Sequence, residues 1–184
     1  MTLVFLRHPR PAVAPGICYG RLDLADGPDA AREIAAALAA TPPLAALWHS
    51  PARRTAALAA ALATRDSLAP QVDARLHELD FGAWEGRAWA VIDRVESDPW
   101  AADPRRRAPP GGERFDDLLA RLAAWLDDRA AAPGAMGPIG IVTHAGVIRA
   151  ARMLVEGASF EAVFAEPVPY ATPILLEATT PWPA

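Results

Sequence analysis

Short runs of consecutive apolar residues recur along the chain, separated by longer stretches rich in alanine and leucine. The runs are too short for helices and lack the alternation of a half-exposed strand, so they predict strands buried on both faces of a sheet. The predicted strands are residues 3–6, 44–48, 72–76, 139–143 and 174–177.

Four of the longer stretches predict helices. Residues 29–40 carry early acidic residues and stop before a Pro-Pro pair, and residues 51–64 have Pro51 in the first turn. Residues 113–131 repeat apolar side chains at helical spacing, and 147–155 form a shorter apolar stretch. Because strands and helices alternate, we expect an α/β sheet covered by helices.

The pattern breaks between residues 81 and 112, where tryptophans precede a stretch rich in proline and arginine. We interpret this segment as a flap or lid inserted into one domain that covers residues 1–184. A chain of 184 residues lies within the usual size of a single domain.

Charge and cysteine content narrow the classes of function. The 18 basic residues, all arginine, against 22 acidic ones give a net charge of -4. No overall positive field is present to attract nucleic acid or an anionic membrane, so neither is expected as a partner. Cys18 is the only cysteine, and no Cys/His cluster has the spacing of a zinc site. A cytoplasmic, metal-independent protein without a cofactor is therefore expected, and its oligomeric state is not predicted.

Polar residues directly follow three of the predicted strands. Arg7-His8 follows the first, His49-Ser50 the second, and Thr143-His144 the strand at 139–143. In open α/β sheets, ligands bind at the carboxyl ends of the strands. The shared position of these residues predicts a functional site at that edge of the sheet.

Five motifs occur in a defined order around these residues: Arg7-His8, Ser50-Pro51-Ala52-Arg53, Glu78 to Gly86, Pro110 to Glu113, and Thr143 to Arg149. This order closely resembles the histidine phosphatase superfamily, which includes phosphoglycerate mutases, fructose-2,6-bisphosphatases and α-ribazole phosphatases. The resemblance implies a three-layer helix-sheet-helix sandwich with a mainly parallel central sheet.

The resemblance also implies a phosphatase that hydrolyses a small phosphorylated metabolite. His8 matches the phosphorylated histidine, Arg7 and Arg53 the phosphate clamp, His144 the second histidine at the phosphoryl group, and Glu78 the general acid. A planar guanidinium can bind two phosphate oxygens, and a positioned acid protonates the departing alkoxide.

Several further residues receive weaker predictions. Tyr19, Gly20 and Ala145 are expected to contact substrate, Tyr19 and Gly20 because the sequence around Cys18 resembles a loop of the α-ribazole phosphatases. Arg54 is expected to be peripheral, and Arg149 to hold the site or its helix together.

Three other features of the sequence are also interpreted. The run from Arg105 to Arg107 is interpreted as a solvated charged surface in preference to a binding site for a distal anion. Pro9 stands where the family usually has glycine, and it lacks a backbone N–H, so the phosphate cradle must differ there. The helix that begins near Pro51 is a further candidate for binding the anion through free backbone N–H groups.

Alternatives remain open at this stage. Within the family, the chain could be an α-ribazole phosphatase or a phosphoglycerate mutase. Loss of an asparagine typical of mutases, and a shorter chain, favour water as the phosphoryl acceptor. A different class of function is a catalytically inactive protein that binds a phosphorylated metabolite.

Overall fold

The computed structural model describes residues 1–132 and 137–179. Within these residues one sheet has the strand order β3-β2-β4-β1-β5. Only β5 runs antiparallel to its neighbour, and the other pairs are parallel, so the prediction of a mainly parallel sheet is confirmed. The strands are β1 (Thr2–Arg7), β2 (Ala46–His49), β3 (Gln71–Val72), β4 (Ile139–Thr143) and β5 (Pro173–Glu177).

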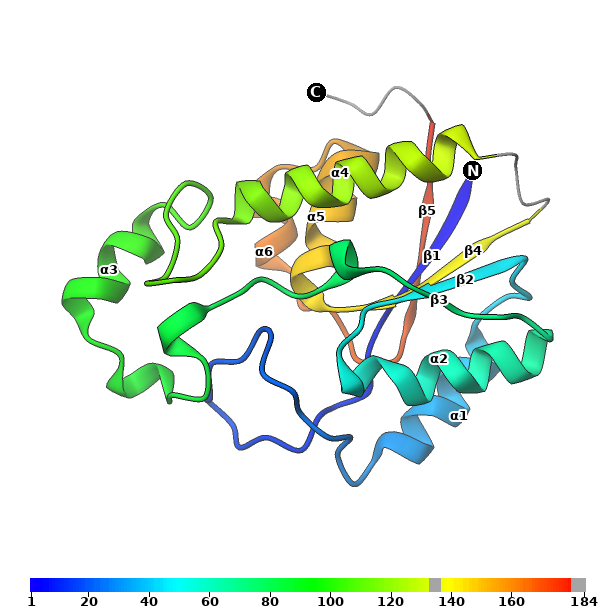
Figure 1. The fold of residues 1–184 in the computed structure, drawn as a ribbon, viewed down its shortest axis with the longest axis horizontal. Helices are drawn as coiled ribbons and strands as arrows, with labels where there is room; N and C mark the ends of the chain where they lie inside the picture. Colours follow the sequence, from blue (N-terminus) through cyan, green and yellow to red (C-terminus); the bar gives the residue numbers. More distant parts are fainter. Residues whose placement is uncertain (133–136, 180–184) are drawn as a thin grey trace.

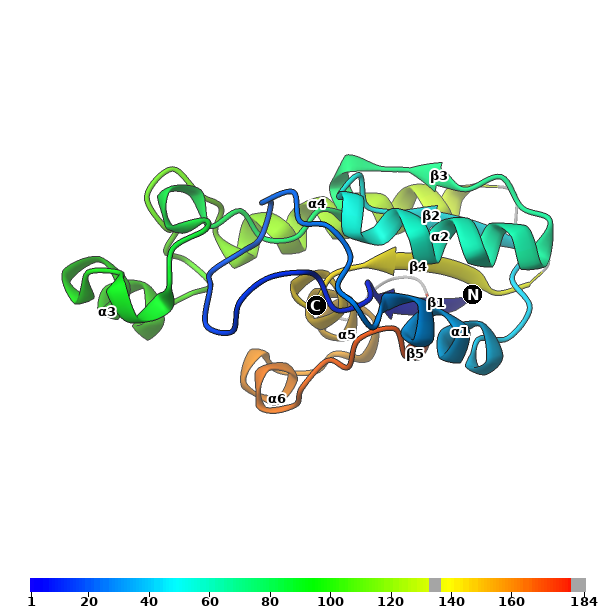
Figure 2. The same cartoon turned by 90° about the horizontal axis from the view of Figure 1, so that it is seen from below.

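Helices cover both faces of this sheet, which gives the three layers visible in Figure 1. The helices α1 (Ala30–Ala40) and α2 (Arg53–Asp66) lie on one face, and α4 (Phe115–Ala131) and α5 (Ala145–Glu156) lie on the other. Figure 2 views the molecule from the side of α1 and α2, which lie in front of the strands. The predicted three-layer α/β fold is confirmed.

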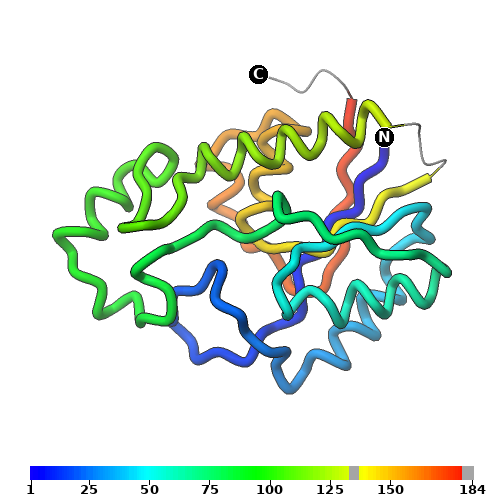
Figure 3. The backbone as a smooth tube through the Cα atoms, viewed as in Figure 1, coloured from blue at the N-terminus to red at the C-terminus, as the bar shows by residue number. Residues whose placement is uncertain are grey.

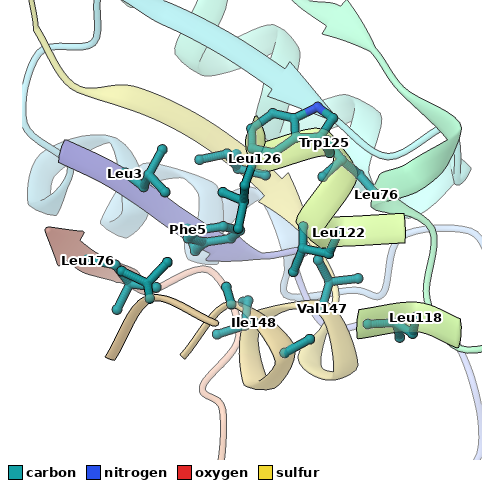
Figure 4. Close-up of a cluster of buried hydrophobic side chains, with 14 of the residues drawn as sticks. Leu3, Phe5, Leu76, Leu118, Leu122, Trp125, Leu126, Val147, Ile148 and Leu176 are labelled. Carbon is teal, nitrogen blue, oxygen red and sulfur yellow. The ribbon is translucent and has the colours of Figure 1, made fainter. Parts of the chain in front are cut away.

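Alternation along β1 explains how the sheet holds two cores. Leu3 and Phe5 pack with α4 and α5, whereas Val4 and Leu6 pack with α1 and α2. All four side chains are fully buried, as expected for a central strand covered on both faces. Figure 4 shows the larger cluster, in which Trp125 lies close to the strands.

Most element predictions are confirmed, with three corrections. The strand predicted at residues 72–76 exists but is shorter and starts earlier: β3 ends at Val72, and the Asp73 side chain accepts a hydrogen bond from the Arg75 N–H, so a short 3-10 helix, η1 (Ala74–Leu76), follows. Pro51 precedes α2 and does not lie in its first turn. The short helix α6 (Phe160–Ala165) was not predicted.

The segment that we interpret as a lid contains η2 (Gly82–Trp84), η3 (Trp89–Val91) and α3 (Arg94–Ala102). It extends away from the sheet, on the left in Figure 1. Its two ends lie in close contact: a Cβ on Gly82 would lie 2.3 Å from the Pro110 carbonyl oxygen, and one on Gly112 would lie 2.5 Å from that of Asp80. Glycine is required here because two backbones meet without room for a side chain.

Aromatic rings form the centre of this lid. The indoles of Trp89 and Trp100 stack at 5.9 Å, and Trp84, which is fully buried, contacts both. The loop after β1 joins the lid, because the Cys18 N–H donates to the Arg87 carbonyl oxygen, and the chain path in Figure 3 shows the two segments side by side. No helix in the described part of the chain is long and apolar enough to cross a membrane.

Candidate active site

The carboxyl ends of the adjacent strands β1, β4 and β2 bring together the polar residues that follow them. Arg7 pairs with Thr143 in the sheet register, so His8 and His144 emerge side by side. Their ring centroids are 5.2 Å apart. His8 is 1% exposed and His144 is fully buried. The predicted convergence of these two histidines is therefore confirmed.

The contacts of His8 specify which ring nitrogen is free to react. Nδ1 lies 2.7 Å from the carbonyl oxygen of Pro9, an acceptor, so Nδ1 carries the proton. Nε2 accepts a hydrogen bond of 3.2 Å from Nε of Arg54, since a guanidinium can only donate. The unprotonated Nε2 is thus the atom with a lone pair.

The arginine at this site is Arg54, and the prediction that Arg53 faces the site is wrong. Arg53 is exposed, whereas Arg54 is fully buried and donates to His8, His144 and the carbonyl oxygens of Gly20 and Leu22. The reason is the phase of α2. Residues four apart share a helix face, and Arg54 shares the inner face with the buried Leu58.

The N-terminus of α2 also differs from the prediction. The Arg53 N–H donates to the carboxylate of Asp23 over 3.2 Å, and the Ala52 N–H donates to the Ser50 hydroxyl oxygen. These two backbone donors of the helix start are therefore already used within the protein.

His144 makes two hydrogen bonds, one in which its ring accepts and one in which its ring donates. Its Nδ1 accepts from Nη2 of Arg54 over 3.1 Å, which places the ring proton on Nε2, and Nε2 lies 2.7 Å from the Ser50 hydroxyl oxygen. Ser50 follows β2, so all three strand ends contribute to the site.

Burial keeps both histidines uncharged. Desolvation, followed by the charge of Arg54, lowers the pKa of His8 and of His144 well below the ordinary histidine value. A neutral ring next to a guanidinium is suited to act as a nucleophile, because protonation would remove its lone pair.

Glu78 is held by backbone donors. One carboxylate oxygen accepts from the Leu79 N–H over 3.0 Å and the other from the Gly146 N–H, at the start of α5, over 3.1 Å. A Cβ on Gly146 would lie 2.2 Å from the carboxylate, so glycine leaves space for this acid. The contact with Gly146, two residues after His144, places Glu78 near the histidine pair.

Arg7, the last residue of β1 and the one before His8, has unused hydrogen-bonding capacity. Its Nη1 donates to the Val168 carbonyl oxygen over 2.8 Å, and its guanidinium lies 3.6 Å from the centre of the Tyr170 ring. Its Nε is buried and has no hydrogen-bond partner among the described residues. A buried donor without a partner is costly, and an anion would satisfy it.

Tyr170 was not singled out from the sequence, because only the tertiary fold brings it to the site. Its ring lies 5.7 Å from that of His8, and its hydroxyl lies 3.0 Å from the hydroxyl of Tyr19. Burial and this hydrogen bond raise the pKa of Tyr19 to about 12. Tyr19 therefore lies close to His8 through Tyr170, and its contact with substrate stays a prediction.

Glu85 was quoted within a motif but given no role, although it organises the loop after β1. Its carboxylate accepts from the N–H groups of Gly20, Arg21, Leu22 and Phe81. Gly20 lies too close to the Leu79 carbonyl oxygen for any side chain. The Gly20 carbonyl oxygen accepts a hydrogen bond from Arg54 and so helps to position that arginine.

The remaining predicted residues have mixed placements. Ala145 is buried at the start of α5, directly after His144. Arg149 joins α5 to the α6 region by donating to the Val163 carbonyl oxygen, in line with a holding role. The run from Arg105 to Arg107 is exposed, and Arg105 pairs with Asp116, as a solvated surface would. No group of three or more potential metal-ligating side chains occurs within residues 1–132 and 137–179.

Comparison with known proteins gives several related phosphatases. Glucosyl-3-phosphoglycerate phosphatase of Mycolicibacterium vanbaalenii is 34% identical over 162 residues, which cover 80% of this chain and 71% of that protein. The structure of the mycobacterial glucosyl-3-phosphoglycerate phosphatase with VO3 superposes with a TM-score of 0.79 at 28% identity, covering 96% of this chain and 92% of that one. The α-ribazole phosphatase of Shigella flexneri shares the fold, with a TM-score of 0.84 at 20% identity over 98% of this chain and 92% of that one.

A bifunctional protein of Mycobacterium tuberculosis is 40% identical over 89 residues, which cover 46% of this chain. The match spans only 24% of that protein's length. The model of the histidine phosphatase superfamily (branch 1) matches residues 3–180, nearly the whole chain. With the paired histidines and the fold, this match shows that the chain belongs to the histidine phosphatase superfamily.

Proposed function

We propose that this protein hydrolyses a small phosphate monoester through a phosphohistidine intermediate on Nε2 of His8. The observation that carries the proposal is the set of contacts around that atom. Nε2 carries the lone pair of the ring, the Arg54 donor that contacts it would turn to a phosphoryl oxygen, and Arg7 offers an unpartnered buried N–H. Phosphoryl transfer needs just such a positioned nucleophile surrounded by positive donors.

The proposed reaction has two steps. Nε2 of His8 attacks phosphorus, the bond from phosphorus to the ester oxygen breaks, and Glu78 gives its proton to the departing alkoxide. Water then attacks phosphohistidine, with Glu78 accepting a proton, and releases inorganic phosphate. Arg7, Arg54 and His144 contact the phosphoryl oxygens and offset their negative charge. Ala145 and Tyr19 border the bound group.

In this scheme Arg54 binds the phosphoryl oxygens, the role that the motif resemblance had given to Arg53. Arg53, which is exposed, is not part of this proposed mechanism. The site needs no metal ion in this scheme, because the arginines supply the positive charge. We propose that the enzyme acts on a phosphorylated metabolite in the cytoplasm, with neither nucleic acid nor membrane as partner; the net charge of -4 and the single cysteine support this.

The choice of substrate within the family stays a proposal. α-Ribazole phosphatase, glucosyl-3-phosphoglycerate phosphatase and phosphoglycerate mutase activities are the candidates that the resemblance and the relatives' names suggest. An inactive phosphometabolite-binding protein is the alternative of another class. That alternative predicts phosphate binding without turnover of p-nitrophenyl phosphate.

Trapping the intermediate tests the proposal directly. Brief reaction with a labelled phosphate monoester, in excess EDTA, is expected to leave label on the protein that is lost in acid and retained in alkali, as a phosphoramidate bond requires. The His8→Ala variant is expected to take up none. Label that survives acid, label that persists in His8→Ala, or labelling that requires a divalent ion would each contradict the scheme.

A further inference from the structure

A cavity of about 290 Å³ lies next to Glu78, between the lid and the helices α4 and α6. Its lining is almost entirely carbon, and five aromatic rings contribute to it: Phe81, Trp100, Phe115, Phe160 and Phe164. Glu78 and Arg149 are the charged residues in the lining.

The aromatic walls are held in place by one another. Phe115, at the start of α4, contacts Phe160 and Phe164 of α6 with ring centroids 5.2 and 5.5 Å apart. On the lid side, Phe81 and Trp100 contact each other at 6.1 Å. Rings that pack in this way form a defined apolar surface that a ligand can enter without reorganising it.

Glu78 connects this cavity to the histidine pair. It lines the cavity, and its carboxylate also accepts a hydrogen bond from the Gly146 N–H, two residues after His144. The proposed acid must touch the ester oxygen that it protonates. The alcohol part of the substrate, which is bonded to that oxygen, therefore starts beside Glu78, at the cavity.

We propose that this cavity binds the leaving group and that the substrate is the phosphate ester of an apolar alcohol carrying an aromatic ring. The inference rests on the proposed function and specifies its substrate class. An apolar cavity of about 150 Å³ accepts benzene, so about 290 Å³ accommodates a ring with a short linker. The hydroxyl groups of a sugar would lose hydrogen bonds to water here, and almost no polar wall atoms replace them.

A series of primary alkyl phosphates tests the proposal without the confounding effect of leaving-group acidity. Ethyl, hexyl and 2-phenylethyl phosphate release alcohols of similar basicity, and glucose 6-phosphate adds a hydroxylated leaving group. We expect hexyl phosphate also to exceed ethyl phosphate, but by less than about fourfold for each buried methylene, because a flexible chain loses conformational entropy on entering the cavity. We expect 2-phenylethyl phosphate to exceed ethyl phosphate by about 30-fold, the effect of burying one aromatic ring.

Two neighbouring alanines of α3 offer a matched pair of variants. Ala101 and Ala102 are both exposed, but only Ala101 is part of the cavity lining. Ala101→Trp is expected to fill the cavity and to reduce the preference for 2-phenylethyl over ethyl phosphate at least tenfold. Ala102→Trp is expected to keep the wild-type preference.

The outcomes separate this inference from the proposed function. If no ester in the series is hydrolysed, the proposed function itself fails. If ethyl phosphate and glucose 6-phosphate are hydrolysed with the same kcat/KM as 2-phenylethyl phosphate, the enzyme is a phosphatase but the assignment of the cavity is wrong. A preference that survives in Ala101→Trp, or that Ala102→Trp abolishes equally, would also overturn the assignment.

Discussion

Two consecutive arginines have opposite environments at the start of one helix. Arg54 lies on the inner face of α2 and donates to both histidines, while the side chain of Arg53 is exposed. The charge and chemistry of the two side chains are identical, so only the phase of the helix distinguishes them. A motif comparison displaced by one residue therefore selects the wrong arginine.

Replacement of each arginine tests this placement. Arg54→Ala is expected to lower kcat for p-nitrophenyl phosphate by about 10²- to 10³-fold. This is the usual effect of removing a donor that stabilises charge in the transition state. Arg53→Ala is expected to stay within about twofold, the usual effect of a surface change. Steady-state rates measure both.

Arg54 is also buried, so its removal could unfold the protein, and thermal melts must accompany the rates. Arg54→Lys keeps the charge but cannot make the planar set of contacts, and we expect it to fold and to remain strongly impaired. Equal losses in Arg53→Ala and Arg54→Ala would refute the assignment of Arg54.

At the scale of elements, the site depends on the loop between β1 and α1 as much as on the strands. Glu85 accepts four backbone N–H groups, three of them in this loop, and the Gly20 and Leu22 carbonyl oxygens in turn accept from Arg54. One carboxylate in the lid thereby fixes the loop that positions the buried arginine.

Glu85→Ala is expected to lower the free energy of unfolding by about 2–4 kcal/mol, since hydrogen bonds to a charged acceptor contribute about 1.5–3 kcal/mol each and water replaces part of the loss. Because Arg54 loses its orientation, kcat is also expected to fall. Urea denaturation and turnover measure the two effects, with Glu161→Ala, an exposed acid in α6, as control. If Glu85→Ala has the stability of the wild type, the loop between β1 and α1 keeps its conformation without Glu85, and the role given to this carboxylate is wrong.

The elements that could be predicted from the sequence are those that local pattern determines. β1 and β4 are continuous apolar runs, and their carboxyl ends placed His8 and His144 correctly. Residues 72–76 are apolar only in part, and the Asp73 side chain accepts a hydrogen bond from the Arg75 N–H, which turns the chain away after Val72. Tyr170 is brought to His8 by the pairing of chain segments far apart in sequence, which no local pattern records.

At the scale of the whole molecule, an acidic protein encloses a basic centre. The net charge is -4, yet Arg7 and Arg54 lie beside the paired histidines, with Glu78 as the acid held at the start of α5. Burial removes the screening that water would provide, so the field of these guanidinium groups is strong within the site. The two histidines remain neutral because burial disfavours their charged form and the arginines add to this effect, which links the site to the stability of the fold.

That linkage predicts how stability changes with pH. In the unfolded chain, a histidine binds a proton as the pH falls through about 6.5, whereas burial and Arg54 keep the pKa of His8 and His144 well below that value in the folded protein. The unfolded state then holds more protons. The free energy of unfolding is therefore highest above about pH 6.5 and falls as the pH decreases, by up to about 1.4 kcal/mol per pH unit for each ring.

Between about pH 6.5 and 5 the slope comes from the histidines, and His77, whose pKa is also lowered by burial, contributes to it. The carboxyl groups whose pKa is lowered by arginine partners, such as Asp66 and Asp73, have an ordinary value of 3.8, so their contribution is lost only at lower pH. Urea denaturation at half-unit steps across this interval measures the slope. His8→Gln removes one of the three rings whose pKa is lowered and is expected to reduce the slope by up to about 1.4 kcal/mol per pH unit. A slope unchanged in His8→Gln would mean that His8 binds a proton equally well in the folded and unfolded states, and the neutral nucleophile inferred from its burial would be wrong.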